Sequence, residues 1–214
     1  MDYFLTMQSR KLFLWPLLIL AITSPTVSSY AQNDAFLEKL RSQNQFLVSF
    51  QARFAQTKKS PILEDDLLSS GMLYFKKDRN IRWEQQKPVA HILILNQDSM
   101  YEYRADVTAS KRPISGTFRQ FQNLITNVVN GTFIRESYHS AEVWKQGDLI
   151  HYRITDPKGK MKKLIREIEL TFDRESAFLM QLRFIDRSEQ QIKIVFTEHQ
   201  INHLENSLFA IPDE

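Results

Sequence analysis

The sequence predicts a mainly β protein with helices (α+β), in which a single curled antiparallel sheet forms an open half-barrel covered by helices. Short β-patterned segments separated by turn residues fill most of the chain, and only two segments have the apolar spacing of an amphipathic helix. A sheet of ten or more twisted strands must curl. Its concave face would be apolar, and the two helices are the available cover.

The first 31 residues have the three parts of a signal peptide. Arg10 and Lys11 supply the positive charge, residues 12–22 form an apolar run, and residues 29–31 form a small-x-small cleavage site. The run is shorter than the ~20 apolar residues that a spanning helix needs. We therefore expect export, cleavage after Ala31, and one folded domain over residues 32–214.

Charge and cysteine content limit the partners and the kind of stabilisation that can be expected. The formal net charge is +3, and it falls only to +2 when Asp2, Arg10 and Lys11 leave with the signal peptide, so a nucleic-acid partner is not expected. The chain contains no cysteine, so an exported form would depend on its core and sheet rather than on disulfides.

The domain begins with a predicted helix over residues 33–45, with Phe36, Leu37 and Leu40 on one stripe. Residues 46–59 alternate apolar and polar side chains, which predicts a half-buried strand. Residues 60–68 contain a proline and three consecutive acidic residues, and they are expected to form a polar loop.

The next segment, residues 70–103, is the centre of the predicted sheet. Strands are expected over residues 71–76, 81–85, 89–95 and 100–103, joined by turns at residues 78–80, 87–88 and 96–98. Residues 72–75 and 92–95 are apolar on both faces, unlike a sheet with one solvated face. Either a second layer covers each face, or one face lines a cavity for an apolar ligand.

A polar stretch over residues 104–113 precedes the second predicted helix, which spans residues 118–129 and ends at Asn130 and Gly131. Its apolar stripe either packs on the sheet or also serves as a lid. The remaining strands form a predicted meander. They cover residues 142–146, 149–155, 168–172, 178–184 and 192–196, with a turn at 156–159.

No catalytic constellation is found, so neither an enzyme nor a cofactor is predicted. Cys, HExxH, GxSxG and glycine-rich phosphate loops are missing from the sequence. His199 and His203 lie four residues apart but on a predicted strand end, so no metal site is expected. The aromatic residues Phe50, Phe54, Phe75, Trp83 and Tyr103 either fill a core or line a cavity for acyl chains.

An ordered set of motifs resembles the LolA family of soluble periplasmic carriers, which take lipoproteins to the outer membrane. The motifs span essentially the whole predicted domain. In chain order they are Phe50 to Thr57 (FQARFAQT), Gly71, Lys76-Lys77, Trp83, Gln86-Lys87-Pro88, the hairpin over residues 92–103 and Phe209-Ala210-Ile211-Pro212.

The resemblance implies a monomeric periplasmic carrier that shelters lipoprotein acyl chains in an apolar cavity. It receives cargo from an inner-membrane ABC-type exporter and passes it to an outer-membrane acceptor. The implied cavity residues are Phe50, Phe54, Leu73, Phe75, Ile81 and Trp83. The implied lid helix carries Phe118, Phe121, Leu124, Ile125 and Val128.

The chain departs from the family at the hairpin tip over residues 77–79. Family members have an arginine followed by proline there, which helps to retain cargo, whereas this chain has Lys77 followed by Asp78. Lysine lacks the planar fork of arginine, and Arg79 is the candidate substitute. Two alternatives stay open: a carrier of a glycolipid or other amphiphile for a dedicated exporter, and a periplasmic sensor or interaction module that does not shuttle cargo.

Overall fold

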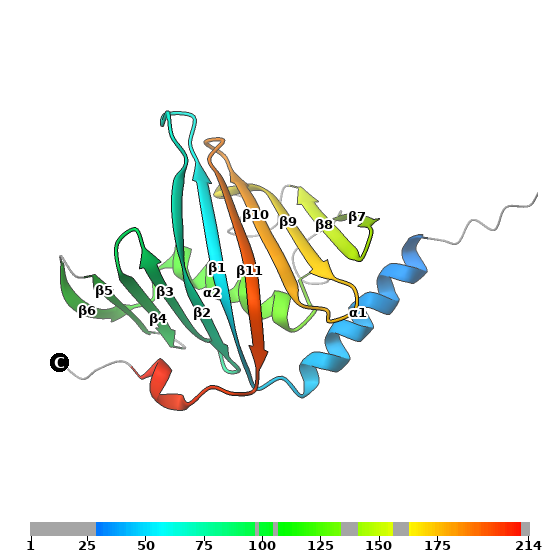
Figure 1. Cartoon of the computed structure of the whole chain (residues 1–214), viewed down its shortest axis with the longest axis horizontal. Helices are drawn as coiled ribbons and strands as arrows, with labels where there is room; N and C mark the ends of the chain where they lie inside the picture. The colour runs from blue at the N-terminus through cyan, green and yellow to red at the C-terminus, as the bar shows by residue number, and fades with distance from the viewer. Residues whose placement is uncertain (1–28, 97–98, 105–106, 134–140, 156–162, 211–214) are drawn as a thin grey trace, which may run out of the picture.

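A computed structural model describes residues 29–96, 99–104, 107–133, 141–155 and 163–210, and it confirms the predicted fold class. Eleven antiparallel strands form one open sheet, with two helices on one of its faces (Figure 1). The first half contains α1 (Ser29–Gln45), β1 (Ser49–Lys59), β2 (Leu67–Lys76), β3 (Asn80–Lys87), β4 (His91–Asn96), β5 (Ser99–Arg104) and β6 (Val107–Pro113). The second half contains α2 (Gly116–Val129), β7 (Ala141–Gln146), β8 (Leu149–Thr155), β9 (Ile165–Asp173), β10 (Leu179–Asp186), β11 (Gln191–Ile201) and the short 3-10 helix η2 (Asn206–Phe209).

The strand order shows two meanders joined at their centre. The order across the sheet is β6-β5-β4-β3-β2-β1-β11-β10-β9-β8-β7. The first and last strands of the chain, β1 and β11, therefore pair with each other, and β6 and β7 form the two edges. Each half pairs consecutive strands, as the predicted meander requires.

Helix α2 crosses the sheet because of this order. It connects β6 at one edge to β7 at the other, and it lies behind the sheet in Figure 1. The helix ends at Gly131, whose φ of +65° is the left-handed conformation that glycine adopts without strain. The Thr132 amide donates to the Asn127 carbonyl oxygen and closes the helix end (2.9 Å). In the described ranges, no helix is long and apolar enough to cross a membrane.

Two aromatic clusters fill the face that the helices cover. On one half, Trp83 stacks on Phe54 with ring centroids 3.9 Å apart and meets Phe121 of α2 edge-on. On the other half, Phe133, Tyr152 and Phe172 form a second cluster that also contacts Phe36 of α1. Aromatic pairs of this kind add about 0.5–1.5 kcal/mol each beyond the buried area.

Several sequence-based boundaries differ from the structure. The polar segment after Tyr103 contains an additional strand, β6, so six strands rather than five precede α2. Leu67 and Leu68 belong to β2 and not to the predicted loop, because they pair with Lys58 and Thr57. α1 begins at Ser29 rather than Asn33, so its first three residues belong to the predicted signal peptide. The predicted strand over residues 89–95 begins instead at His91. The predicted turn at 156–159 lies outside the described residues.

Gly71 is the position where the sheet tolerates no side chain. A Cβ atom placed there would lie 1.9 Å from the backbone oxygen of Glu84 on β3. Gly71→Ala should therefore push β3 away and reduce the free energy of unfolding by about 1–3 kcal/mol or more, measured by denaturant unfolding. Gly116→Ala is the matched control, because nothing lies within 4 Å of the added Cβ. Equal stability of the two variants would contradict this packing account.

Candidate functional site

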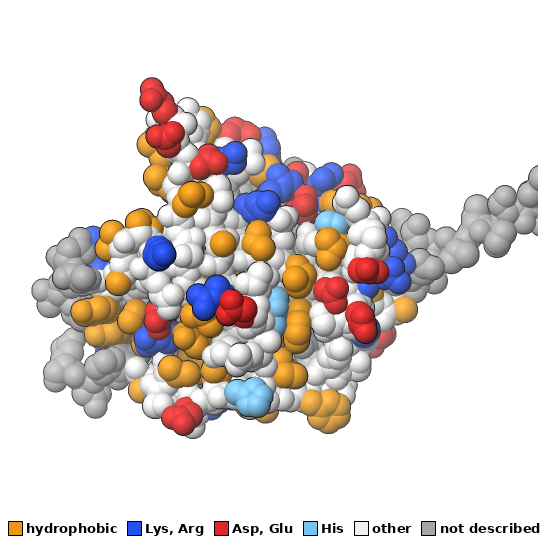
Figure 2. All heavy atoms as spheres, viewed as in Figure 1, with side chains coloured by type: hydrophobic (Ala, Val, Ile, Leu, Met, Phe, Trp, Pro, Cys, Tyr) orange, Lys and Arg blue, Asp and Glu red, His pale blue; other side chains and the backbone are white. Residues whose placement is uncertain are grey.

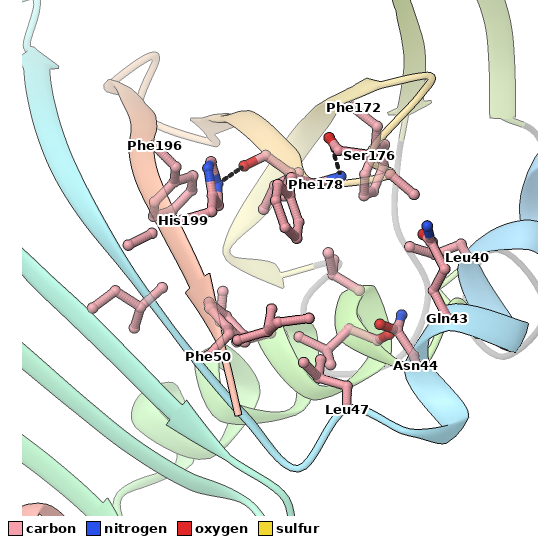
Figure 3. Close-up of a pocket in the computed structure, with 18 residues that line it drawn as sticks. Leu40, Gln43, Asn44, Leu47, Phe50, Phe172, Ser176, Phe178, Phe196 and His199 are labelled. Carbon is pink, nitrogen blue, oxygen red and sulfur yellow. Dashed lines mark hydrogen bonds between the residues drawn. The ribbon is translucent and has the colours of Figure 1, made fainter. Parts of the chain in front are cut away.

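An apolar cavity of about 400 Å³ lies between the two helices and the sheet (Figure 3). Its lining includes Leu73 from one half of the sheet and Phe172 from the other. The cavity is partly open to solvent, and Ile201 in its lining is 43% exposed. The full lining is Leu40, Gln43, Asn44, Leu47, Phe50, Ala52, Leu73, Ile125, Val128, Val129, Phe172, Ser176, Ala177, Phe178, Leu179, Phe196, His199 and Ile201.

The polar side chains of this lining are amides, a hydroxyl and an imidazole, without a Lys, Arg, Asp or Glu among them. The Ser176 hydroxyl donates to the Asp173 carboxylate (2.7 Å), and the Asn44 amide donates to the Val129 carbonyl oxygen. In the described part of the chain, no group of three His, Cys, Asp or Glu side chains is placed to hold a metal ion. The cavity therefore offers apolar contact with a few uncharged hydrogen-bonding groups.

A β-bulge brings His199 into the cavity. Arg53 on β1 pairs with Thr197, whereas Gln51 pairs with Gln200, so the register slips by one residue between them. Glu198, with φ of 53°, is the extra residue of β11. The slip moves His199 and Ile201 to the face that Phe196 already occupies, which alternation along the strand alone would not predict.

The imidazole of His199 is held between β10 and β11. Its ring stacks on Phe178 with centroids 4.7 Å apart, and Nε2 lies 3.0 Å from the Leu179 carbonyl oxygen (Figure 3). A carbonyl oxygen only accepts, so Nε2 carries the proton of this bond. Burial lowers the pKa of His199 below its ordinary value of 6.5, against the smaller opposing effect of this hydrogen bond.

The six residues that the sequence assigned to the cavity separate into two groups. Phe50 and Leu73 line it. The other four lie in the packed core and outside the lining, where Phe54 stacks on Trp83, Phe75 stacks on Phe50, and Ile81 is fully buried.

The predicted lid residues of helix α2 also separate into those that line the cavity and those that do not. Ile125 and Val128 face the cavity, and Val129 joins them. Leu124 is buried outside the lining, and Phe118 and Phe121 pack against the core. Sequence reasoning missed the contributions of Gln43, Asn44 and the β9–β10 connection, because periodicity does not reveal which loop reaches a distant helix.

The hairpin tip between β2 and β3 contacts both helices. Lys77 Nζ donates to the carbonyl oxygen of Gln45 at the end of α1 (2.8 Å). Arg79 Nη2 donates to Asn123 Oδ1 of α2 (2.7 Å), and Gln122 of α2 donates back to the Arg79 carbonyl oxygen (2.6 Å). Asp78 and Arg79 both have positive φ, a conformation common in hairpin turns.

Helix α1 has further polar tethers at the cavity. Lys39 Nζ donates to the carbonyl oxygens of Arg174 and Glu175 in the β9–β10 turn (2.9 and 2.6 Å). Asn202, after β11, accepts from the amides of Val48 and Ser49 and donates to the Phe46 carbonyl oxygen (2.7, 3.2 and 3.2 Å). Asn202 therefore fixes the link between α1 and β1.

The lowered pKa of His199 predicts a pH dependence of stability. Below about pH 6.5 the unfolded chain binds a proton that the folded chain resists, so the free energy of unfolding falls as the pH decreases through this range. His199→Gln keeps a donor for Leu179 and should lose less stability between pH 7.5 and pH 5 in urea unfolding. His203→Gln, at an exposed imidazole, is the control. The same pH dependence in His199→Gln and the unmodified protein would refute the assignment.

Comparison with solved structures finds similar chains at low sequence identity. A LolA superfamily protein from Nitrosomonas europaea is 13% identical, with a TM-score of 0.47, and the match covers 84% of this chain and 97% of that one. A putative outer membrane lipoprotein-sorting protein domain from Vibrio parahaemolyticus is 9% identical, with a TM-score of 0.43 and coverages of 82% and 94%. The lipoprotein LppX of Mycobacterium tuberculosis is 13% identical, with a TM-score of 0.44 and coverages of 81% and 98%.

Comparison with curated proteins gives no match. The family model described as "Outer membrane lipoprotein carrier protein LolA" matches residues 46–212. This range contains every strand of the sheet, helix α2 and most of the cavity lining. The chain belongs to the LolA family.

Proposed function

We propose that this protein is a periplasmic carrier that shelters the acyl chains of lipoproteins and moves them between the inner and outer membranes. The observation that carries the proposal is the partly open apolar cavity between α1, α2 and the sheet. Its volume of about 400 Å³ lies in the range of about 300–1,000 Å³ that is common for ligand pockets.

Binding without chemistry suits this lining. Burying an acyl chain gains about 0.8 kcal/mol per CH₂ group, so apolar walls alone hold a long chain. Ser176 and His199 both line the cavity, but the Ser176 hydroxyl donates to Asp173 and His199 Nε2 bonds to Leu179. Neither is arranged as a nucleophile with its base, which supports a carrier rather than an enzyme.

We infer export and the partners from the sequence pattern and from what the family resemblance implies. The N-terminal segment has the pattern of a cleaved signal peptide, which would deliver a monomeric chain to the periplasm. An inner-membrane ABC-type exporter would load the cavity, and an outer-membrane acceptor would unload it. The description of the matched family supports a role as a carrier of outer membrane lipoproteins.

The size of the cavity favours a second candidate, a carrier of a single-chain glycolipid or similar amphiphile. A CH₂ group is similar in size to a water molecule, which takes up about 30 Å³. A cavity of about 400 Å³ therefore holds roughly a dozen CH₂ groups. This is close to one acyl chain. Mass spectrometry of lipid that co-purifies from the periplasm separates the two candidates, and a lipoprotein with several chains would require the helices to move apart.

Filling part of the cavity should weaken binding while the fold survives. Ala52→Phe places a ring in the lining, whereas Ala55→Phe makes the same change on the exposed side of the same strand. Because displacing two CH₂ groups removes about 1.6 kcal/mol of binding energy, we expect Ala52→Phe to weaken binding of a diacyl lipopeptide by about tenfold or more. Calorimetric titration and ligand-induced thermal shift measure this. Equal affinity in both variants would refute the cavity as the binding site.

The hairpin contacts further suggest a latch formed by Lys77 and Arg79. These two side chains tie the turn between β2 and β3 to α1 and α2, the two helices that line the cavity. The contact of Arg79 with Asn123 supports its role as substitute for the family arginine. Removing both hydrogen bonds would weaken the attachment of the helices while leaving the side chains of the apolar core unchanged.

Lys77→Met with Arg79→Met tests the latch, because methionine keeps an unbranched side chain of similar reach but cannot donate. Amide hydrogen exchange in α1 and α2 should become severalfold faster than in the unmodified protein, and bound lipopeptide should dissociate faster. Lys193→Met, at an exposed lysine of β11, is the control. Unchanged exchange in both helices would rule out this role.

A further inference from the structure

The tip of the β1–β2 hairpin, residues 60–68, combines exposed apolar and acidic side chains. Ile62 is 85% exposed and Leu68 is 66% exposed, and Leu63 and Leu67 are also exposed. Between them lie Glu64, Asp65 and Asp66. The hairpin projects beyond the neighbouring strands at the top of Figure 1, and Figure 2 shows apolar and acidic side chains gathered on this projection.

The fold does not require these apolar side chains. They are far from the helix-covered face, and a local turn in which the Leu63 amide donates to the Ser60 carbonyl oxygen (3.1 Å) orders the tip. Monomeric proteins usually avoid grouped exposed apolar residues, which typically mark an interaction site. The simplest alternative is a soluble turn kept from aggregating by its acidic residues.

One side of β2 at the tip also lacks a strand partner. β2 pairs with β1 as far as Leu67, but its pairing with β3 begins only at Ser70. Leu67, Leu68 and Ser69 therefore present strand edge on the β3 side. Such an edge accepts main-chain hydrogen bonds from an added segment.

The tip lies far from the cavity. Ala52 of β1 lines the cavity, and Ser60 begins the tip eight residues later, just after the end of this strand. At about 3.3 Å per residue, they are about 26 Å apart. A partner on the tip would leave the cavity mouth free.

We propose that the tip docks into an apolar groove of a partner protein whose rim carries Lys and Arg. The apolar side chains would enter the groove, and the three carboxylates would meet the basic rim. Asp66 already pairs with Lys59 (3.1 Å), whereas Glu64 and Asp65 form no ion pair in the part of the chain that the structure describes. These two carboxylates provide the charge complementarity and steer the encounter.

A membrane surface fits the tip less well than a basic protein groove. Cytoplasmic and other anionic leaflets attract basic segments and repel acidic ones. Inserting Ile62 and Leu68 would bring Glu64 and Asp65 to the headgroups. The tip is therefore assigned to a protein and not to a lipid bilayer.

Site-specific photocrosslinking in the bacterium that produces this chain tests the proposal. p-Benzoylphenylalanine replaces Ile62 in one full-length variant and the exposed Val89, in the β3–β4 turn, in the matched control. We expect one discrete protein adduct from position 62 and none from position 89. The crosslinked partner peptide, sequenced by mass spectrometry, should carry Lys or Arg beside apolar residues.

Charge neutralisation provides the decisive comparison. Glu64→Gln, Asp65→Asn and Asp66→Asn together should reduce the adduct from position 62 by about tenfold, since rim charges set encounter and register. Neutralising the exposed Asp148, Glu175 and Glu205 instead should leave it unchanged. Unchanged thermal unfolding of both triple variants checks the fold.

Four results would each overturn the proposal. They are a missing adduct, a crosslinked second copy of this chain, an adduct that survives neutralisation, and flotation of the protein with phosphatidylglycerol–phosphatidylethanolamine vesicles.

Discussion

The need to cover one apolar face of an open eleven-stranded sheet determines the rest of the structure. Because β1 pairs with β11, the two halves of the sheet extend in opposite directions and end at β6 and β7. The chain must then pass from one edge to the other, and it does so through α2. α1 covers the part that α2 leaves open, and the cavity lies between the two helices and the sheet.

Aromatic packing and single hydrogen bonds both hold the sheet and its two helices together. Large aromatic clusters hold each half of the sheet together, around Phe54 and Trp83 in one half and Tyr152 and Phe172 in the other. At the cavity, by contrast, α1 is tied by individual hydrogen bonds, such as those of Lys39 and Asn44. Single hydrogen bonds contribute about 0.5–1.5 kcal/mol each. The helices are therefore held both by such bonds and by apolar side chains that pack in the core of the sheet, such as Phe36 of α1 and Phe121 of α2.

The sequence predicts the fold well because periodicity and turn residues are local signals. Alternation from Val48 to Phe54 specifies β1, and the stripe from Phe118 to Val129 specifies α2. The strand β6 escaped prediction because its sequence, VTASKRP, is polar and lies at an edge, where one side faces solvent. Pairing with β5, rather than its own pattern, makes it a strand.

The cavity was less predictable because it depends on where elements meet. Phe54 and Trp83 are large and apolar like Phe50, but they stack on each other and fill their own space. Only Phe50 and Leu73, of the six expected residues, reach the unfilled region. His199 enters through a bulge that reverses the alternation of β11, and a sequence pattern does not show such a register shift.

The proposed carrier function depends on an acyl chain lying in this cavity. Methyl NMR of the protein bound to a lipopeptide with a ¹³C-labelled acyl chain tests this. We expect intermolecular NOEs from the acyl chain to the methyl groups of Leu40, Leu73, Ile125 and Val128, which line the cavity. NOEs confined to exposed methyl groups such as those of Ile62, or none to the cavity at saturating ligand, would contradict it.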